Sequence, residues 1–536
     1  MSQGQLRLCF RAPYPWERSV GAGKGELARA HSISDAANQV RGTNLGVFLA
    51  KWPRRATQKP CLRPDEALRP FLTPLIVACA LFMENLDSTI VSTSLPAIAS
   101  DLHQDPIALK LSMTSYLLAQ AVFIPASGWV ADRFGARTVF RAAILVFTIG
   151  SILCGLSSTL PQFVAARIVQ GCGGAMMAPV GRLALMRSVE RSDLVRALAW
   201  LTIPALIGPM LGPPVGGFIS TYFHWRWNFW INVPIGMLGI TLVSLYIGEF
   251  REENPTPFDT RGFVLSGLGL SSVIFGLTVL GRGFLPLAAI VALILFGLIC
   301  LALYVRHART APSPILDLTL FRIKTYRASV IGGSLFRIGV GATPFLLPLL
   351  LQLGFGMTPF QSGLTTFVAT AGALIMKATA ASALQKFGFR TVLLINGLIS
   401  SLLLAAIGLF GVATPQAALM AVLFAGGFFR SLQFTAINAL AYADIDAARL
   451  SKATSFYAVA QQLALSAGVT FAAAALEIAR ALSGGALGAK EFPPAFFTVA
   501  LISATSLLVF LPLARDAGSK LSGHGGEAEV TKPDPA

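Results

Sequence analysis

Apolar segments of about 20 residues recur along most of the chain, and short polar loops separate them. A helix of that length crosses the hydrocarbon core of a bilayer, because each residue adds about 1.5 Å of rise. The pattern therefore predicts an all-α polytopic membrane protein with fourteen transmembrane helices. The expected spans are residues 71–97, 108–131, 138–157, 160–186, 196–221, 228–248, 262–280, 285–305, 328–353, 359–383, 391–410, 415–442, 453–479 and 492–513.

Both ends of the chain are polar. Residues 1–70 are basic and rich in Gly, Pro and Ser, and they contain no long apolar run. We expect them to form a disordered cytoplasmic tail, or else to result from a start site placed too far upstream. Residues 514–536 are expected to form a short second tail on the same side of the membrane.

The composition excludes several classes of protein. Charged residues make up only 12% of the chain and hydrophobic residues 54%, with a mean hydropathy of +0.67, whereas soluble domains carry about 25% charged residues. The six cysteines form no CxxC pair, the five histidines show no HxxxH or HExxH spacing, and no Walker A motif appears. We therefore expect no metal site, no cofactor, no enzymatic activity and no energy from ATP bound to this chain.

The net charge of +17 is a topology signal. With the N-terminus inside, the inside loops and the C-terminal tail hold 20 Lys and Arg residues, and the outside loops hold 5. Cytoplasmic loops of membrane proteins are enriched in these residues. We therefore expect a plasma (inner) membrane protein with both termini in the cytoplasm and no nucleic-acid partner.

One short sequence occurs twice at equivalent places. Residues 132–140 read DRFGARTVF and residues 386–394 read KFGFRTVLL, which share F-G-x-R-T-V. Each follows the second helix of a set of six, if the two middle spans are set aside. The repeat predicts an internal duplication, with six-helix bundles over 71–248 and 328–513. Residues 249–327 then hold two inserted transmembrane helices and a cytoplasmic linker.

Further motifs carry a resemblance to a known family. They are LDSTIVSTSLP (Leu86–Pro96), the pattern G-x-x-x-D-R-x-G-x-R (Gly128, Asp132, Arg133, Gly135 and Arg137), R-x-x-Q-G (Arg167, Gln170 and Gly171), GPMLGPPVGG (Gly208–Gly217) and HWRWNFWINVPIG (His224–Gly236). With them, residues 71–513 resemble the major facilitator superfamily, specifically its fourteen-span drug:proton antiporter branch. The resemblance implies two bundles that rock about a midplane site, and a proton gradient that drives export.

The loop motif is expected to act in gating. Gly128 should permit a close approach of two helices, and Gly135 should permit a tight turn. Asp132 can pair with a basic residue of a neighbouring helix, and the resemblance implies that this contact latches the outward-facing state. The alternative is that Arg133 and Arg137 simply anchor the loop at the inner face.

The GPMLGPPVGG motif is expected to shape its helix, because proline kinks a helix and glycine lets another helix pack closely. The resemblance implies that it marks exporters. We expect this role for six of its seven Gly and Pro positions, namely Gly208, Pro209, Gly212, Pro213, Gly216 and Gly217.

Ionisable residues within the spans are the candidate site. Glu84 and Asp87 are three residues apart and share a face of the first helix, and Arg167 lies at a similar depth in the fourth. Charges at such depth need partners or a water-filled cavity. We expect these three residues to couple transport to protons: the resemblance implies this for Asp87 and Arg167, whereas Glu84 is less typical of the family. Gln170 lies on the same face as Arg167. The alternatives are a fixed structural pair of Asp87 with an arginine, and snorkelling of Arg167 to the interface.

The second half carries intramembrane cations. Arg337 and Arg430 lie near the middles of their spans, and Gln433 and Asn438 extend the polar face that begins at Arg430. We expect them to face the bundle interior or a cavity. Lys377 is a weaker case of the same kind.

These features favour a proton-coupled exporter of small organic compounds. Its partners would be the substrate, protons and the bilayer, and the sequence shows no sign of the periplasmic adaptor and outer-membrane channel with which some such proteins work. One alternative is a dedicated exporter of one metabolite or siderophore with the same fold. The other is a membrane sensor or scaffold without transport, against which the short tails and the lack of a soluble output domain argue.

Overall fold

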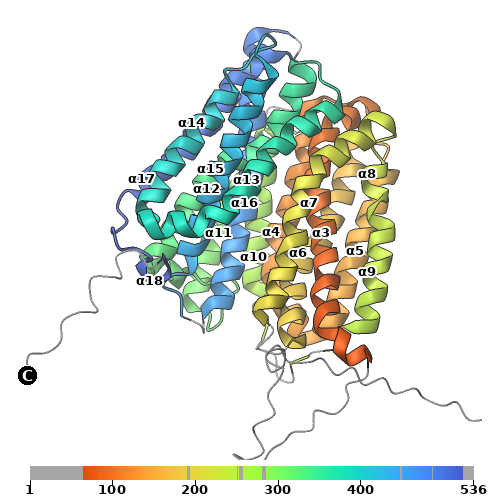
Figure 1. Cartoon of the computed structure of the whole chain (residues 1–536), viewed down its shortest axis with the longest axis vertical. Helices are drawn as coiled ribbons and strands as arrows, with labels where there is room; N and C mark the ends of the chain where they lie inside the picture. The colour runs from red at the N-terminus through yellow and green to blue at the C-terminus, as the bar shows by residue number, and fades with distance from the viewer. Residues whose placement is uncertain are drawn as a thin grey trace, which may run out of the picture. The chain divides into compact units, whose positions relative to one another are not determined.

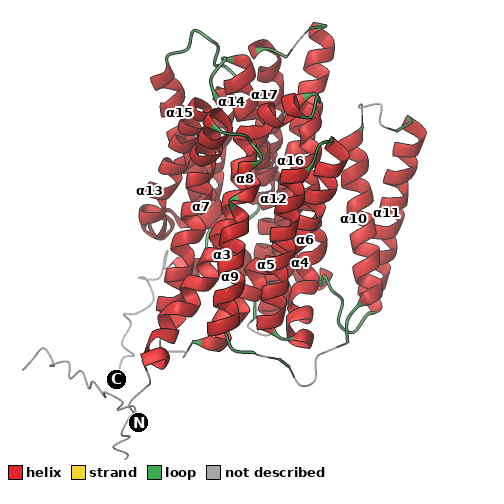
Figure 2. Ribbon diagram, turned by 90° about the vertical axis from the view of Figure 1, so that its right-hand side faces the viewer, coloured by secondary structure: helices red, strands yellow, loops and turns green. Residues whose placement is uncertain are grey.

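The computed structural model describes residues 64–189, 194–249, 251–252, 257–280, 285–446, 449–485 and 487–522. Within these ranges the chain is helical and contains no strand (Figures 1 and 2). The contacts separate residues 1–69 from residues 70–536. The prediction of a disordered tail falls mostly on residues 1–63, which lie outside the described residues.

The helices of the first half match six expected spans. They are α3 (Pro64–Asp101), η1 (Pro106–Leu109) with α4 (Lys110–Phe134), α5 (Ala136–Leu156), α6 (Leu160–Ser188), α7 (Leu194–Tyr222), and α8 (Trp227–Trp230) with α9 (Asn232–Tyr246). Side-chain caps define some of their starts: Asp105 accepts a hydrogen bond from the N–H of Ile107 before η1, and Thr159 caps α6. α3 begins before the expected residue 71, at Pro64.

The remaining helices follow the same order as the expected spans. The inserted pair is α10 (Thr260–Val279) and α11 (Leu287–Thr310), and the linker contains η2 (Leu318–Arg322). The second half comprises α12 (Lys324–Leu349), η3 (Leu350–Gly354), α13 (Pro359–Thr391), η4 (Val392–Asn396), α14 (Gly397–Ile407), α15 (Gln416–Tyr442), α16 (Leu450–Ser483), η6 (Ala489–Glu491) and α17 (Phe492–Phe510), followed by α18 (Ser519–Ser522).

Twelve segments of the described residues are long and apolar enough to cross a membrane. One of them, Pro359–Ile407, covers two expected spans, which a kink separates at Gly388, where the backbone is not helical (φ 69°, ψ 164°). The expected span 196–221 coincides with α7, which is not among the twelve. The total of fourteen therefore stays a prediction.

The repeated F-G-x-R-T-V segments adopt the same local structure. Gly135 and Gly388 have φ of 93° and 69°, a region that side chains disfavour. Two residues later, Arg137 donates to the backbone carbonyl of Ser244, near the end of α9. Arg390 donates in the same way to the carbonyl of Leu511 at the end of α17, at 3.0 Å. Each arginine thus ties its loop to the last helix of its own half, and this similarity supports the predicted internal duplication.

The two halves contact each other through α7 with α13 and through α4 with α16. Figure 1 shows the first-half helices, among them α3, α5, α6 and α9, on one side and the second-half helices α14, α15 and α17 on the other. The inserted helix α10 packs against α11 and also against α4 and α16. It therefore contacts both halves where they meet, and Figure 2 shows the inserted pair side by side at the edge of the molecule.

Asp259 fastens the inserted pair to the linker. Its carboxylate accepts hydrogen bonds from the backbone N–H of Gly262 at 2.9 Å and of Ile315 at 3.1 Å, and it lies 2.7 Å from Nε2 of His307. Burial opposes ionisation of Asp259, but these hydrogen bonds outweigh it and hold the pKa of the carboxyl below its usual value.

The buried apolar cores show at which end the halves meet. Near the Asp101 end of α3, a single core joins Ile98 and Phe163 of the first half to Phe345 and Phe492 of the second. Towards the Thr73 end, each half has a separate core of its own. A small fourth cluster joins α4, α11, the linker and α16. The halves are thus packed together at the Asp101 end and mostly separate at the Thr73 end.

Polar contacts between the halves also gather at the Asp101 end. Nζ of the buried Lys110 lies 3.0 Å from Glu477, and Asp105 pairs with Arg480. The side chain of Gln352 donates to a carbonyl of α3 at 2.8 Å. These bonds close the molecule at that end.

Candidate functional site

A cavity of about 540 Å³ lies between the two halves. Its first-half wall comes from α3 and α7, and its larger second-half wall comes mainly from α12, α13, α14 and α15. The lining is mostly apolar, with the aromatic rings of Phe336 and Phe434, and it includes the cations Lys377 and Arg430. Cavities of this size with few polar groups are typical binding sites for small organic molecules.

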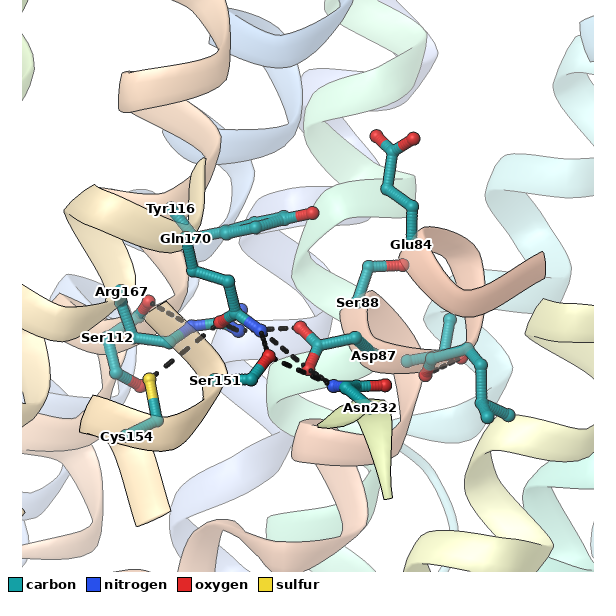
Figure 3. A network of polar contacts seen from close by, with 12 residues as sticks. Glu84, Asp87, Ser88, Ser112, Tyr116, Ser151, Cys154, Arg167, Gln170 and Asn232 are labelled. Atoms are coloured by element: carbon teal, nitrogen blue, oxygen red, sulfur yellow. Dashed lines mark hydrogen bonds and ion pairs between the residues drawn. The ribbon is translucent and has the colours of Figure 1, made fainter. Parts of the chain in front are cut away.

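Asp87 does not line this cavity: it lies in a closed polar network with α6 and α9 and is only 1% exposed. Its Oδ2 is 2.8 Å from Nη1 of Arg167, and its Oδ1 accepts hydrogen bonds from the amides of Gln170 and Asn232, each at 2.8 Å (Figure 3). Ser151 receives further hydrogen bonds from both amides. Both carboxylate oxygens are therefore satisfied without water.

Arg167 is equally enclosed and is also 1% exposed. Besides Asp87 it bonds to Oε1 of Gln170 and to the carbonyl of Ser112, and its guanidinium lies 4.2 Å from the ring centre of Tyr116. Snorkelling does not describe this side chain, because it points into the bundle. The geometry is that of a fixed buried ion pair.

Glu84 has different neighbours, although it shares a helix with Asp87. One oxygen, Oε1, accepts a hydrogen bond from Nε2 of Gln120 on α4 at 2.9 Å. The other oxygen, Oε2, is buried and has no hydrogen-bond partner among the described residues. Figure 3 shows the Glu84 carboxylate pointing away from the Asp87 network. Oε1 of Gln120 accepts in turn from Nε2 of Gln462 on α16, at 2.9 Å, so that this chain of bonds crosses between the halves.

The side chains of the loop motif between α4 and α5 contact α6 and α9 of the first half, and the backbone carbonyl of Asp132 accepts a hydrogen bond from the N–H of Glu252 in the segment after α9. Asp132 pairs with Arg187 of α6 at 3.0 Å, and Arg133 is exposed in the last turn of α4. Gly135 makes the turn, and a Cβ there would clash with the carboxylate of Glu249. The expectation of a close helix approach at Gly128 is wrong for this structure, since a Cβ at that position would meet no atom within 4 Å.

The glycines of α7 form a packing face against α3. A Cβ at Gly212 would lie 2.0 Å from Oγ1 of Thr89, and one at Gly216 would lie 2.5 Å from a carbonyl oxygen of α3. Gly208 approaches α3 in the same way, and Gly217 instead approaches α13. The prolines Pro209 and Pro213 line the cavity, so that this motif contacts the candidate site as well as shaping the helix.

Only some of the polar residues expected to face the cavity lie in its lining. Arg430 and Asn438 line it, whereas Arg337 lies behind Asn438 and donates to its Oδ1 at 2.7 Å. Gln433 does not line the cavity: its amide bonds to Asn396 and to a carbonyl of η4, where the π-helical turn leaves backbone groups to satisfy. Gln170 is also absent from the lining because it serves Asp87.

Sequence reasoning missed several uncharged members of the networks. Asn232 stands in the motif HWRWNFWINVPIG, but no role was assigned to it. Gln120, Gln462 and Ser151 are single polar residues in apolar helices, and only their depth near that of the charged residues could have drawn attention to them.

Two helical halves with a cavity between them, lined in part by ionisable residues within the spans, are the architecture of a membrane transporter. The sequence model of the Major Facilitator Superfamily matches residues 77–324 and 329–533. The chain belongs to that family. It is therefore a transporter of small molecules in a membrane and not an enzyme.

Relatives and solved structures agree with this assignment. A Yersinia enterocolitica protein with the provisional name multidrug resistance protein MdtD is 37% identical over 454 residues, which cover 83% of this chain and 95% of the relative. The crystal structure of a D-xylose–proton symporter matches with a TM-score of 0.59 and 15% identity, covering 84% of this chain and 99% of that one. A POT family transporter in complex with 5-aminolevulinic acid matches with a TM-score of 0.63 and 16% identity, over 82% and 95% of the two chains. At these identities the two structures show a shared fold.

Proposed function

We propose that the protein is a proton-coupled exporter of small organic compounds, a drug:proton antiporter that works by alternating access in the plasma (inner) membrane. The names of its relatives support a role in multidrug resistance. The excess of Lys and Arg on one side of the predicted topology supports cytoplasmic termini. With that orientation, the Thr73 end of α3 faces the cytoplasm, and the contacts at the Asp101 end close the outer side.

The contrast between the two carboxylates carries the proposal. A proton carrier must be able to gain and lose its proton without disrupting the fold. Asp87 accepts bonds at both oxygens from donors that include a buried arginine, so that protonating it would strand a buried cation. Glu84 has a free oxygen and a neutral partner. We therefore assign proton binding to Glu84, and a structural role to Asp87 with Arg167.

The glutamines beside Glu84 offer a means of coupling. An ionised carboxylate only accepts hydrogen bonds, so that it fixes the Gln120 amide with Nε2 towards Glu84 and Oε1 towards Gln462. A protonated Glu84 can itself donate, and the favoured acceptor is Oε1 of Gln120. If the amide turns to offer that oxygen, which also breaks the 3.1 Å hydrogen bond from its Nε2 to the Tyr116 hydroxyl, Gln462 on the other half loses its acceptor. Protonation at α3 thereby changes the free energy of contact between α4 and α16.

Transport in proteoliposomes tests this assignment. The purified protein is reconstituted, a pH gradient is imposed, and the flux of the fluorescent probes carboxyfluorescein and rhodamine 123 is followed. We expect Glu84→Gln to abolish acceleration by the gradient while exchange of probe across the membrane persists, since an amide cannot release a proton. The control Asp516→Asn alters an exposed carboxylate after the last span and should behave as wild type. Full gradient-driven flux in Glu84→Gln would exclude Glu84 as the proton carrier.

A further inference from the structure

We propose that the cavity selects anionic organic compounds, in particular aromatic molecules that carry a carboxylate, and that Arg430 and Lys377 bind the anionic group. The proposal rests on the proposed function for the direction of transport only. The choice of ligand follows from the charges that surround the cavity.

All the ionisable side chains that line the cavity are cations. Lys377 on α13 and Arg430 on α15 are among the lining residues, and no Asp or Glu is. Nζ of Lys377 donates to the hydroxyl of Thr435 at 3.1 Å, which is a neutral partner. Arg430 forms no hydrogen bond and no ion pair with any other residue that the structure describes. The second half therefore presents positive charge that the described part of the protein leaves without a counter-charge.

A third cation, Arg337, contacts a residue of the cavity lining without being part of the lining. Arg337 is 1% exposed, and its Nη2 donates to Oδ1 of Asn438 at 2.7 Å and to the hydroxyl of Tyr457 at 2.6 Å. The Tyr457 hydroxyl donates in turn to the same Oδ1, at 2.7 Å. Both partners are neutral. Because these bonds occupy the amide oxygen of Asn438, its Nδ2 group is left as a hydrogen-bond donor at a residue that lines the cavity.

In the first half, by contrast, the buried cation is paired with a carboxylate. There the buried Arg167 has the Asp87 carboxylate at 2.8 Å. An uncompensated cation inside a membrane protein is costly, and an intramembrane charge usually marks a binding pathway. A carboxylate from the ligand would supply the missing counter-charge, and the planar guanidinium of Arg430 suits a carboxylate geometrically.

The rest of the lining defines the remainder of the ligand. Phe336 and Phe434 contribute aromatic rings, and Leu347, Leu374 and Val422 contribute aliphatic surface. An aromatic body with one acidic group would fill such a site. A cationic drug of the same size would meet like charge, which lowers its affinity relative to the anion.

Two dyes with the same ring system separate these cases. Carboxyfluorescein is an anionic xanthene and rhodamine 123 is a cationic one. Binding of each to the purified full-length protein in detergent is measured by fluorescence anisotropy, without any proton gradient. We expect a Kd for carboxyfluorescein at least about tenfold below that for rhodamine 123, since a hydrogen bond to a charged group contributes about that factor or more.

Matched variants locate the anion site. Arg430→Gln and Lys377→Gln should each raise the Kd for carboxyfluorescein by about tenfold, and Arg430→Lys should recover part of the loss. Lys386→Gln removes one positive charge from an exposed position on the same helix as Lys377, outside the cavity lining, and should leave the Kd unchanged. Size-exclusion profiles verify that each variant is folded.

The outcomes distinguish this proposal from the proposed function. Preference for rhodamine 123, lack of binding of both dyes, or an equal loss in Lys386→Gln would overturn the anion site. Binding of carboxyfluorescein that depends on Arg430, without any flux driven by a pH gradient, would support the anion site and overturn proton-coupled export. Gradient-driven flux of rhodamine 123 without flux of carboxyfluorescein would support proton-coupled export and overturn the anion site.

Discussion

The buried pair of Asp87 and Arg167 should respond to substitution as a structural ion pair. Replacing Arg167 by Met leaves an ionised carboxylate that is 1% exposed and keeps only the two amide donors. Removing one partner of a buried pair costs about 3–5 kcal/mol, and we expect this variant near the upper limit. Asp87→Asn strands the arginine, which keeps its bond to a backbone carbonyl and its contact with an aromatic ring, so we expect about 3 kcal/mol.

The double variant is the decisive measurement. Asp87→Asn with Arg167→Met removes both charges, and its loss of unfolding free energy should be smaller than the sum of the single losses by at least about 2 kcal/mol. Unfolding is followed by tryptophan fluorescence in mixed micelles with increasing dodecyl sulfate. Glu84→Gln serves as the control and should lie within about 1 kcal/mol of wild type, because the amide can still bond to its glutamine neighbour. Additive losses in the double variant would refute the structural reading of this pair.

Three further results are expected. Gly216→Ala should lower the thermal stability by an amount equivalent to about 1–3 kcal/mol because its Cβ meets the α3 backbone, whereas Gly128→Ala, with open space around it, should be neutral or raise it slightly. Asp259→Asn should destabilise the protein at pH 7, and since the pKa of this carboxyl is lowered on folding, the difference from wild type should shrink as the pH falls below the usual value of 3.8. Glu477→Gln removes the carboxylate next to the buried Lys110 and should weaken the contact between α4 and α16 at the Asp101 end. Distances between spin labels on these two helices at that end should therefore increase. Adding Lys110→Gln removes the unpaired cation and should partly reverse the increase.

The sequence predicted the helices well because apolar length is a strong and local signal. Most expected spans fall on a helix of the structure within a few residues. The α3 start at Pro64 differs from the prediction, since that boundary is not marked by a change in hydropathy alone, whereas the kink at Gly388 falls within the loop expected between the tenth and eleventh spans. The repeated F-G-x-R-T-V segment predicted more of the structure than its short length suggests. In both copies the glycine adopts a positive φ, and the arginine donates a hydrogen bond to a backbone carbonyl of the last helix of its half.

The site was predicted less completely, for a geometric reason. Helical spacing placed Glu84 and Asp87 on one face, but positions three residues apart still differ by about 60° around the axis. That angle directs Asp87 to α6 and α9 and Glu84 to α4. Which helix lies on each side of α3 depends on how the helices pack, and the periodicity of the sequence does not predict that packing. The same limit explains why Gln433, expected in the cavity, bonds to η4 instead.

The two halves share the same loop but differ in their intramembrane charges. The first half holds the carboxylate of Glu84 and the Asp87–Arg167 ion pair, and the second holds Arg337, Lys377 and Arg430 without acidic partners among the described residues. If the proton binds in the first half and the anionic compound in the second, the two ligands need never compete for one group. Their coupling must then pass through the contact between the halves. The Gln120–Gln462 bond lies in that contact, between the same two helices against which α10 packs. Loss of that bond in a Gln462→Leu variant should therefore leave the affinity for each ligand intact and weaken only the dependence of one on the other.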